Sequence, residues 1–196
     1  MKLEKEFWDD RYLNENTGWD IGYASTPLSS YVDSIDNKNL KILIPGCGNA
    51  YEAEYLIEKK FSNITLIDIS SVLTGRIKKK FEGDKRVTIL NKDFFEHEGK
   101  YDLILEQTFF CSLDLSMRTE YCMKMNTLLN PDGILAGVLF NTDFGKEGPP
   151  FGGSKTEYKK LFSKFFDIKI LKECYNSIQP RAGKELFFIF KKIRKK

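Results

Sequence analysis

The sequence predicts an α/β fold built around a mainly parallel sheet. Short apolar runs alternate with longer amphipathic stretches along the chain, which is the pattern of repeated strand–helix units. The run at 40–44 is apolar and rich in branched residues, and Pro45-Gly46 ends it. The run at 64–67 has the same character and ends in Asp68. Two such strands, each followed by a helical stretch, indicate an open sheet with polar residues at the carboxyl ends of its strands.

The elements of the first half follow from local signals. The strand at 40–44 leads into a helix over 50–60. The strand at 64–67 leads into a second helix, which Ser70-Ser71 can cap and which runs toward Phe81. Branched and aromatic residues predict further strands at 87–90 and 101–105.

The second half is predicted in the same way. A helix over 116–129 is expected to end at Asn130-Pro131-Asp132-Gly133, a strong turn signal, before a strand at 134–140. A loop rich in glycine and proline occupies 145–153. The remaining expected elements are a helix over about 156–165 and two late strands at a sheet edge, 168–171 and 186–190.

Length and composition fit one domain over residues 1–196. The chain has 196 residues, of which 41% are hydrophobic, enough for a single sizeable core. Its net charge of +3 is too small to predict nucleic-acid binding, and the basic residues at 76–86 and 191–196 are expected to form a solvated helix face and a tail. No apolar run suits a signal peptide or a membrane span, and the four cysteines lack metal-type spacing.

From these observations we expect a cytoplasmic protein with no nucleic-acid partner, no membrane partner and no metal site. The chain is also large enough to be a stable monomer. His97 is the sole histidine, which argues against a histidine-clustered metal centre, and it is expected in a surface turn.

The N-terminal segment, residues 1–39, is unusually aromatic. It holds both tryptophans, Trp8 and Trp19, ahead of the first predicted strand. Such residues either pack under the sheet or cover a site as a lid. Aromatic side chains usually belong to the core, so position alone favours packing.

A ligand site is predicted at the carboxyl ends of the strands. Gly46 and Gly48 let backbone N–H groups approach a ligand closely, and the next helix directs its positive end there. Asp68 follows Gly46 by 22 positions and can accept both hydrogen bonds of a ribose diol. Tyr51 stands where a dinucleotide fingerprint has its third glycine, so a smaller adenosine ligand fits better than a dinucleotide.

With these residues the sequence resembles the class I methyltransferases that use S-adenosylmethionine. It is similar in particular to the thiopurine S-methyltransferase family and, within it, to the halide/thiol methyltransferases. The motifs that carry the resemblance run through nearly the whole chain: Trp8 with Arg11-Tyr12, Thr17-Gly18-Trp19-Asp20, Thr26-Pro27-Leu28, Ile44-Pro45-Gly46-Cys47-Gly48-Asn49, Tyr101-Asp102-Leu103-Ile104, Phe109-Phe110-Cys111, Gly148-Pro149-Pro150-Phe151 and Pro180-Arg181-Ala182-Gly183-Lys184-Glu185.

The resemblance implies a Rossmann-like, seven-stranded, mostly parallel sheet with S-adenosylmethionine as cofactor. It implies that the N-terminal segment is a lid. The cofactor residues would be Trp8 and Trp19 above it, Gly46, Cys47 and Gly48 at the methionine end, Asp68 with Ile69 at the ribose, Asp93 and Phe94 by adenine, and Glu106 beside the sulfonium.

The same resemblance implies an acceptor pocket formed by Phe109, Phe110, Phe151 and Arg181. Simpler interpretations stay open for several of these residues. Asp68, Asp93 and Glu106 can be helix N-caps after strands, and Phe109 or Phe110 can belong to the core.

The chemistry expected from these residues is methyl transfer to a small soft nucleophile. A thiolate, hydrosulfide, thiocyanate, halide or thiopurine-type sulfur needs little general base, so alignment and exclusion of water would be the enzyme's work. Arg181 could attract an anionic acceptor. Two other classes stay open: a sensor that binds an adenosine ligand without catalysis, and an NAD-dependent oxidoreductase, against which Tyr51 argues.

Overall fold

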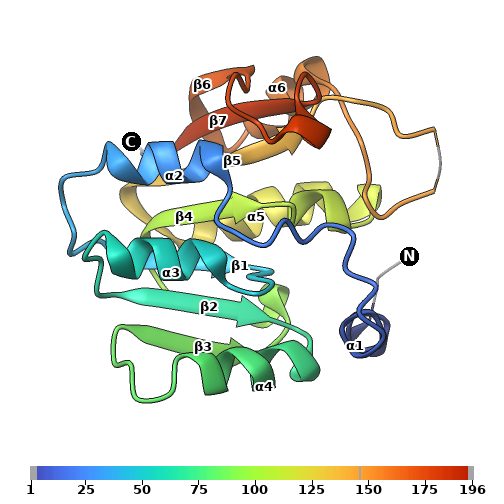
Figure 1. Ribbon diagram of the computed structural model, residues 1–196. Coiled ribbons are helices and arrows are strands. Elements are labelled where there is room, and N and C mark those ends of the chain that lie inside the picture. The colour runs from blue at the N-terminus through green and yellow to red at the C-terminus, as the bar shows by residue number, and fades with distance from the viewer. Residues whose placement is uncertain (1–3, 146, 194–196) are drawn as a thin grey trace.

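The computed structural model describes residues 4–145 and 147–193 (Figure 1). Its centre is a seven-stranded sheet in the order β3-β2-β1-β4-β5-β7-β6. The strands are β1 (Ile42–Pro45), β2 (Ile64–Asp68), β3 (Val87–Asn91), β4 (Tyr101–Gln107), β5 (Leu129–Phe140), β6 (Phe166–Glu173) and β7 (Glu185–Lys192). The first five strands pair in parallel, and β7 pairs antiparallel with both β5 and β6. The sequence prediction of a seven-stranded, mostly parallel sheet is therefore confirmed.

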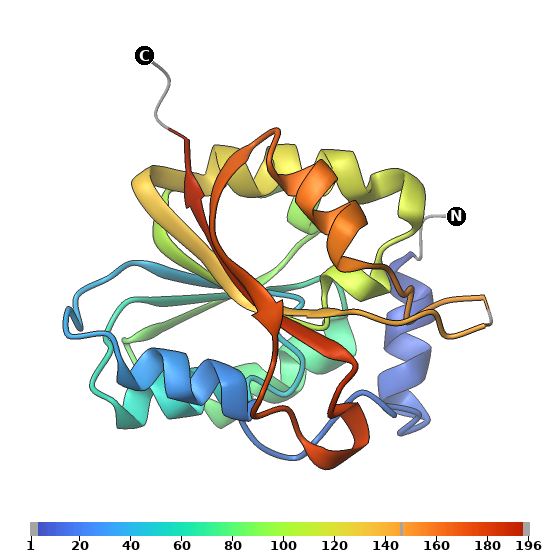
Figure 2. The ribbon, with the colours of Figure 1, turned by 90° about the horizontal axis from the view of Figure 1, so that it is seen from above.

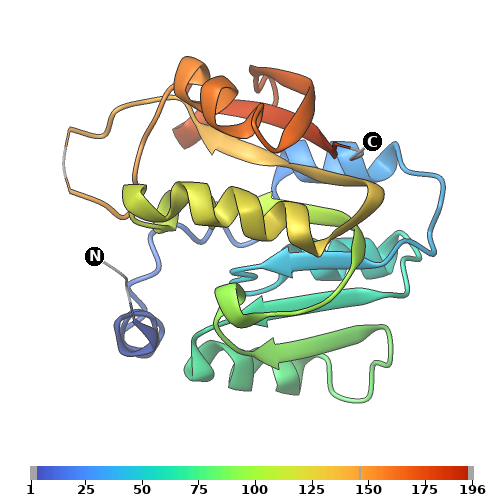
Figure 3. The same ribbon diagram turned by 180° about the vertical axis from the view of Figure 1, so that it is seen from behind.

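Helices cover both faces of the sheet. The α-helices are α1 (Lys5–Leu13), α2 (Thr26–Asp33), α3 (Tyr51–Glu58), α4 (Ser71–Lys80), α5 (Arg118–Leu128) and α6 (Lys155–Phe162). Figure 2 shows α2 and α3 on one side of the sheet with α5 and α6 on the other, and Figure 3 shows α5 and α6 from behind. α1 belongs to neither layer, because it lies beyond the carboxyl ends of the parallel strands (Figure 1).

The core divides along the sheet into two apolar clusters. One joins α2, α3 and α4 to the sheet through residues such as Leu28, Leu56 and Leu73. The other joins α5 and α6 to the opposite face and contains much of the phenylalanine of the chain. Within it, the rings of Phe188 and Phe190 on β7 stack with centroids 4.4 Å apart.

The predicted turn at 130–133 lies inside β5 instead of before it. Tyr101 of β4 pairs with Leu129, and Leu103 pairs with Ile134, so the four residues between form an irregularity within one long strand. Asp132 takes a positive φ of 64° there, which is the conformation that the turn signal anticipates. The local backbone was predicted correctly, but the strand begins earlier because Leu129 pairs before the irregularity.

One surface expectation differs from the structure, whereas the expected solvated face of basic residues is present, since Arg76 and the lysines at 78–80 on α4 are exposed. His97 is buried, not in a solvated turn, and its Nε2 lies 2.7 Å from the hydroxyl of Tyr101. Burial lowers the pKa of His97, with nearby lysines acting in the same direction. Arg76 of the basic stretch donates to the carbonyl of Tyr12 at 2.9 Å and so joins α4 to α1. Of the basic tail, 194–196 lie outside the described residues, and Lys191 pairs with Asp132 at 2.9 Å.

Candidate functional site

A cavity of about 490 Å³ opens at the carboxyl ends of β1, β2 and β4. α1 and the chain that follows it close the cavity from the outside (Figure 1). Most residues predicted for the site line it: Trp8, Trp19, Gly46, Cys47, Gly48, Asp68, Ile69, Asp93, Phe94, Phe109 and Arg181. The topology thus brings together residues separated by most of the chain length.

The loop after β1 forms the floor of the cavity. Gly46 and Gly48 have φ angles of 56° and 51°, a region that side chains other than glycine rarely adopt. A Cβ on Gly46 would lie 2.4 Å from Cδ2 of Phe109, so the absence of a side chain also makes room for that ring. Burial raises the pKa of the Cys47 thiol well above its usual value, so Cys47 is held as a protonated packing group.

Asp68 ends β2 at the centre of the cavity wall. Its Oδ1 accepts a hydrogen bond from the backbone N–H of Ser70 at 2.9 Å. Burial raises the pKa of Asp68 to about 6, an effect that backbone N–H groups of Ser70 and Gly48 oppose and that the nearby charge of Asp9 reinforces. A carboxylate with this surrounding can accept further hydrogen bonds from a diol placed in the cavity.

We expect ligand binding through Asp68 to weaken at acid pH. Only the ionised carboxylate accepts two hydrogen bonds from a diol, so affinity should fall about tenfold per pH unit below a pKa of about 6. Isothermal titration with S-adenosylhomocysteine between pH 5 and 8 measures this dependence. The Asp68→Asn protein should show a weak affinity that is nearly independent of pH over the same range. A wild-type affinity that is flat down to pH 5 would contradict the assignment.

The aromatic residues of the N-terminal segment form a continuous group over the cavity. The rings of Trp8 and Trp19 meet edge to face with centroids 5.6 Å apart, and Tyr12 meets Trp19 at 5.8 Å. Tyr12 is buried among core residues, whereas Trp8 and Trp19 are half-buried on the cavity wall. Tyr12 therefore anchors this segment in the core, and the two tryptophans line the cavity.

Asp9 fastens α1 to the first turn of α4. Its carboxylate accepts hydrogen bonds from the Ser70 and Ser71 hydroxyls at 2.6 and 2.9 Å and from the Val72 N–H at 3.0 Å, and Lys5 lies 3.0 Å away. Although burial raises it, these hydrogen bonds hold the pKa of Asp9 well below its usual range. A residue of α1 thus caps α4, a contact that sequence spacing gives no sign of.

Replacing Asp9 should loosen the lid. We expect Asp9→Ala to lower the free energy of unfolding by about 2 kcal/mol at pH 7, because helix α4 loses a cap and α1 its attachment. A carboxylate with a lowered folded-state pKa stabilises above its unfolded pKa, and this stabilisation is lost as the pH falls toward the folded-state value. The deficit relative to wild type should therefore shrink below about pH 4.

Thermal unfolding across this pH range checks the Asp9 prediction. The matched control is Asp10→Ala, the neighbouring position on α1, where the exposed carboxylate bonds only locally to Asn14 at 2.8 Å. Asp10→Ala should change stability by less than about 0.5 kcal/mol. Equal effects at the two positions would show that the contact to α4 contributes nothing specific.

The far end of the cavity holds Lys92, Asp93 and Phe94. Asp93 accepts a hydrogen bond from the backbone N–H of Phe95 at 2.9 Å and so caps the short 3-10 helix Phe94–Glu96. The Phe94 ring lies edge to face on Phe109 with centroids 5.1 Å apart. The N-cap interpretation of Asp93 is thus correct, and the residue also lines the cavity.

Three residues expected in the site do not line it. Glu106 is fully buried beneath it, where Oε1 accepts hydrogen bonds from the N–H groups of Phe109 and Phe110 at 2.7 and 2.8 Å, and burial raises its pKa to about 7. Phe110 belongs to the aromatic core, against Tyr121. Phe151 is absent from the cavity lining, whereas the preceding Pro149 and Pro150 line it. All three residues are close to the site in sequence, but none of them lines the cavity.

Arg181 closes the opposite end. One Nη donates to the backbone carbonyl of Trp19 at 2.8 Å, and the other lies 3.6 Å from Glu185, which is buried. The guanidinium also stands over the Phe140 ring, 5.8 Å from its centroid. Arg181 therefore holds the tryptophan segment in place as well as carrying a positive charge to the cavity.

Other lining residues were not among the site residues predicted from the sequence. They include Asp20 and Glu52, both near Arg181, and Cys111, whose pKa burial raises. Glu52 falls in the first turn of the helix after the glycine loop, a place where acidic residues are common for helix stability. That ordinary explanation hides its second property, that the side chain is directed into the core and the cavity.

No helix within residues 4–145 and 147–193 combines the length and apolar character that crossing a bilayer requires.

The chain is similar in sequence to known methyltransferases over nearly its whole length. The family model for "Thiopurine S-methyltransferase (TPMT)" matches residues 3–193. The chain is 30% identical over 191 residues to "Probable thiol methyltransferase 2" of Arabidopsis thaliana, covering 94% of this chain and 84% of that one. It is 27% identical over 197 residues to "Thiocyanate methyltransferase 1" of Brassica oleracea, covering 97% and 87%.

A solved structure shares the fold. The 1,6-didemethyltoxoflavin-N1-methyltransferase of Burkholderia thailandensis, crystallised with S-adenosylhomocysteine, superposes with a TM-score of 0.78 at 17% identity, covering 97% of this chain and 87% of that one.

Proposed function

The chain belongs to the thiopurine S-methyltransferase family, and from this premise we propose that it methylates a small, soft sulfur or halide nucleophile. It is an S-adenosylmethionine-dependent methyltransferase. Family membership removes the NAD-dependent oxidoreductase from consideration. The observation that carries the proposal is one cavity in which a glycine loop, a strand-end carboxylate and aromatic residues of the N-terminal segment meet an apolar pocket lined by Arg181.

The residues present fit the cofactor. The positive φ angles of Gly46 and Gly48 leave the floor open to close approach by an amino-acid moiety. Asp68 would accept hydrogen bonds from the ribose, with Ile69 beside it, and Asp93 and Phe94 would flank adenine. Trp8 and Trp19 would cover the assembly and exclude water. The cofactor supplies an activated methyl group on a positively charged sulfur.

The acceptor would lie between Phe109, Phe140 and Arg181. Aromatic walls remove water from a soft nucleophile and so raise its reactivity, while confinement aligns it for in-line displacement. Arg181 orients Trp19 and offers its charge to the pocket. Acceptor binding beside Arg181 would suit the thiols and thiocyanate that the relatives' names mention.

The test is a panel of acceptors with methyl-labelled S-adenosylmethionine. Iodide, thiocyanate, hydrosulfide, an alkyl thiol, an aromatic thiol and a thiopurine are compared, with volatile and extractable label counted separately. Label in at least one soft nucleophile is expected, and Arg181→Ala should lower kcat/KM at least tenfold. Cofactor binding without label in any acceptor would favour the non-catalytic sensor. An unchanged kcat/KM in Arg181→Ala would remove Arg181 from the pocket's function.

We extend the proposal to the setting of the enzyme. The four cysteines are free and buried, which suits a reducing cytoplasm. A monomer is expected because the chain is large enough to be stable alone, and the modest net charge of +3 argues against a nucleic-acid partner. Size-exclusion chromatography with light scattering tests the monomer directly.

A further inference from the structure

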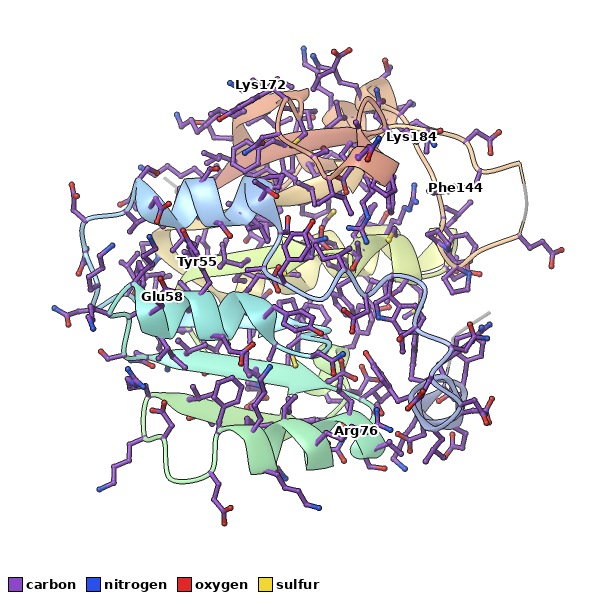
Figure 4. All side chains as sticks on the ribbon, in the orientation of Figure 1. Tyr55, Glu58, Arg76, Phe144, Lys172 and Lys184 are labelled. Carbon is purple, nitrogen blue, oxygen red and sulfur yellow. The ribbon has the colours of Figure 1, made fainter. Side chains whose placement is uncertain are left out.

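A buried carboxylate lines the cavity within electrostatic reach of Arg181. Glu52 lies in the first turn of α3, is 9% exposed, and lines the cavity. Its Oε1 accepts a hydrogen bond from the backbone N–H of Ser25 at 2.9 Å. That bond fixes the carboxylate beside the segment that carries Trp19. Helix α3 therefore presents one of its acids to the site and leaves another, Glu58, exposed at its other end (Figure 4).

Several groups around Glu52 act on its pKa in opposite directions. Burial raises its pKa, the Ser25 N–H and the charge of Arg181 oppose that rise, and Asp20 adds to it. The charge of Glu52 in turn helps to raise the pKa of the buried Cys47 thiol, which burial raises most. A carboxyl group with a raised pKa is a stronger base than an exposed one, and a base performs best when its pKa approaches the working pH.

Acidic residues outnumber basic ones among the side chains that line the cavity. The acidic residues that line it are Asp20, Glu52, Asp68, Asp93 and Asp114, and the basic ones are Arg11, Lys92 and Arg181. Arg181 is in addition paired with buried Glu185. A thiolate entering from water would lose its hydration and meet more negative than positive groups. An un-ionised thiol avoids both costs, but its proton must then leave inside the cavity.

Other lining groups are poorly suited to take that proton. Asp20 already accepts hydrogen bonds from Asn49, Tyr51 and the N–H of Gly22. Cys111 is protonated and donates to the Thr108 carbonyl at 3.1 Å. His97 and Glu106 do not line the cavity.

We infer that Glu52 is the general base for acceptors that enter as neutral thiols or as hydrogen sulfide. The inference rests on the proposed function. The S–H bond breaks as its proton passes to a Glu52 carboxylate oxygen, and the electron pair left on sulfur forms the new S–CH₃ bond. The pair of the broken methyl–sulfonium bond stays on the former sulfonium, which becomes a neutral thioether. Glu52 returns the proton to water after product release.

The decisive experiment compares two acceptors on one protein sample. Iodide carries no proton, whereas an alkyl thiol at pH 7 is almost wholly protonated. Glu52→Gln keeps the size of the side chain and an oxygen for the Ser25 N–H but cannot take a proton. We expect the thiol-to-iodide ratio of kcat/KM to fall about 100-fold in Glu52→Gln. Glu58→Gln, the same substitution at the exposed end of α3, should leave the ratio unchanged.

A second readout is the pH profile with the alkyl thiol. In Glu52→Gln, kcat/KM should rise about tenfold per pH unit up to the thiol's own pKa, because only the thiolate would react. Wild type should show a shallower rise over the same range. Glu52→Asp should recover part of the thiol activity. A misfolded variant loses both acceptors alike and so leaves the ratio unaltered, which separates a structural role from a base.

The outcomes distinguish the two proposals. An unaltered ratio in Glu52→Gln, with wild type active on thiols, overturns the base and leaves the proposed function standing. Wild type could methylate thiols and be inactive on iodide. In that case the reference acceptor of the ratio is changed from iodide to thiocyanate or to an aromatic thiol that is ionised at pH 7. Wild type that methylates no thiol or sulfide overturns the inference itself, and wild type that methylates no acceptor at all overturns both proposals.

Discussion

Asp68→Ala should weaken S-adenosylhomocysteine binding about 100-fold at pH 7.5. The carboxylate is the strand-end acid on the cavity wall and would accept two hydrogen bonds from the ribose diol. Hydrogen bonds to a charged group contribute about 1.5–3 kcal/mol each, part of which is retained when water enters the space. A loss of about 3 kcal/mol corresponds to the expected factor. Isothermal titration calorimetry measures it.

The control for Asp68 is Asp167→Ala, at the opposite edge of the sheet. Asp167 lies on β6 with its side chain 56% exposed, next to Lys169. Its replacement should leave the dissociation constant within about a factor of two. If Asp68→Ala bound as tightly as this control, the ribose would have to be held elsewhere.

The same carboxylate should make the unliganded protein less stable. Burial raises the pKa of Asp68 from an ordinary 3.8 to about 6. A group of this kind contributes most stability below its unfolded pKa, and that contribution is lost as the pH rises through the folded-state pKa. Asp68→Asn should therefore raise the Tm of the free protein at pH 7.5, with a difference that vanishes near pH 4. The site would then sacrifice stability for binding.

Gly46→Ala should be the most destabilising small substitution in the cavity. Its φ of 56° costs about 1 kcal/mol or more for alanine, and the added Cβ would lie 2.4 Å from the Phe109 ring. Displacing that ring disturbs its packing on Phe94 and adds about 1–3 kcal/mol. We expect a total loss of about 3 kcal/mol, a Tm lower by about 6–12 °C, and much weaker cofactor binding.

Two other glycines separate the causes. Gly83 has a φ of 78° with nothing within 4 Å of a new Cβ, so Gly83→Ala should show the backbone cost alone. Gly75 lies exposed in α4 with the same open space and no positive φ, so Gly75→Ala should stabilise by about 0.5–1 kcal/mol. Phe109→Ala in the Gly46→Ala background should recover the steric part. If Gly46→Ala cost no more than Gly83→Ala, the ring would not be in close contact.

The fold could be predicted from sequence because its signals are local. Branched apolar runs, the glycine loop and Asp68 each act within a few residues, and parallel topology then places the strand ends together. The start of β5 was predicted too late because it depends on a long-range contact. Leu129 pairs with Tyr101 of β4, and this pairing extends the strand through a turn signal that was itself correct.

The site could be predicted only in part. Sequence gives the position of a residue along an element but not the direction of its side chain among neighbouring elements. Glu106 lies near the end of β4 and Phe110 follows the strand, yet the carboxylate accepts hydrogen bonds from two backbone N–H groups and the ring joins the core. Glu52 was missed because an acid in the first turn of a helix is ordinary. Its burial depends on α2, whose Ser25 meets it from elsewhere in the chain.

The contact of Asp9 with α4 links α1 to Asp68, the residue proposed to bind the ribose. The Ser70 hydroxyl donates a hydrogen bond to Asp9, and the Ser70 backbone N–H donates one to Asp68. A change at one carboxylate that moves Ser70 therefore alters the hydrogen bond to the other. By reciprocity, whatever free energy a docked α1 adds to ligand affinity, the ligand adds equally to the docking of α1. The first helix is then not an appendage that can be shortened without consequence. A ligand bound at Asp68 should strengthen the docking of α1 if docked α1 raises its affinity, and weaken that docking if docked α1 lowers it.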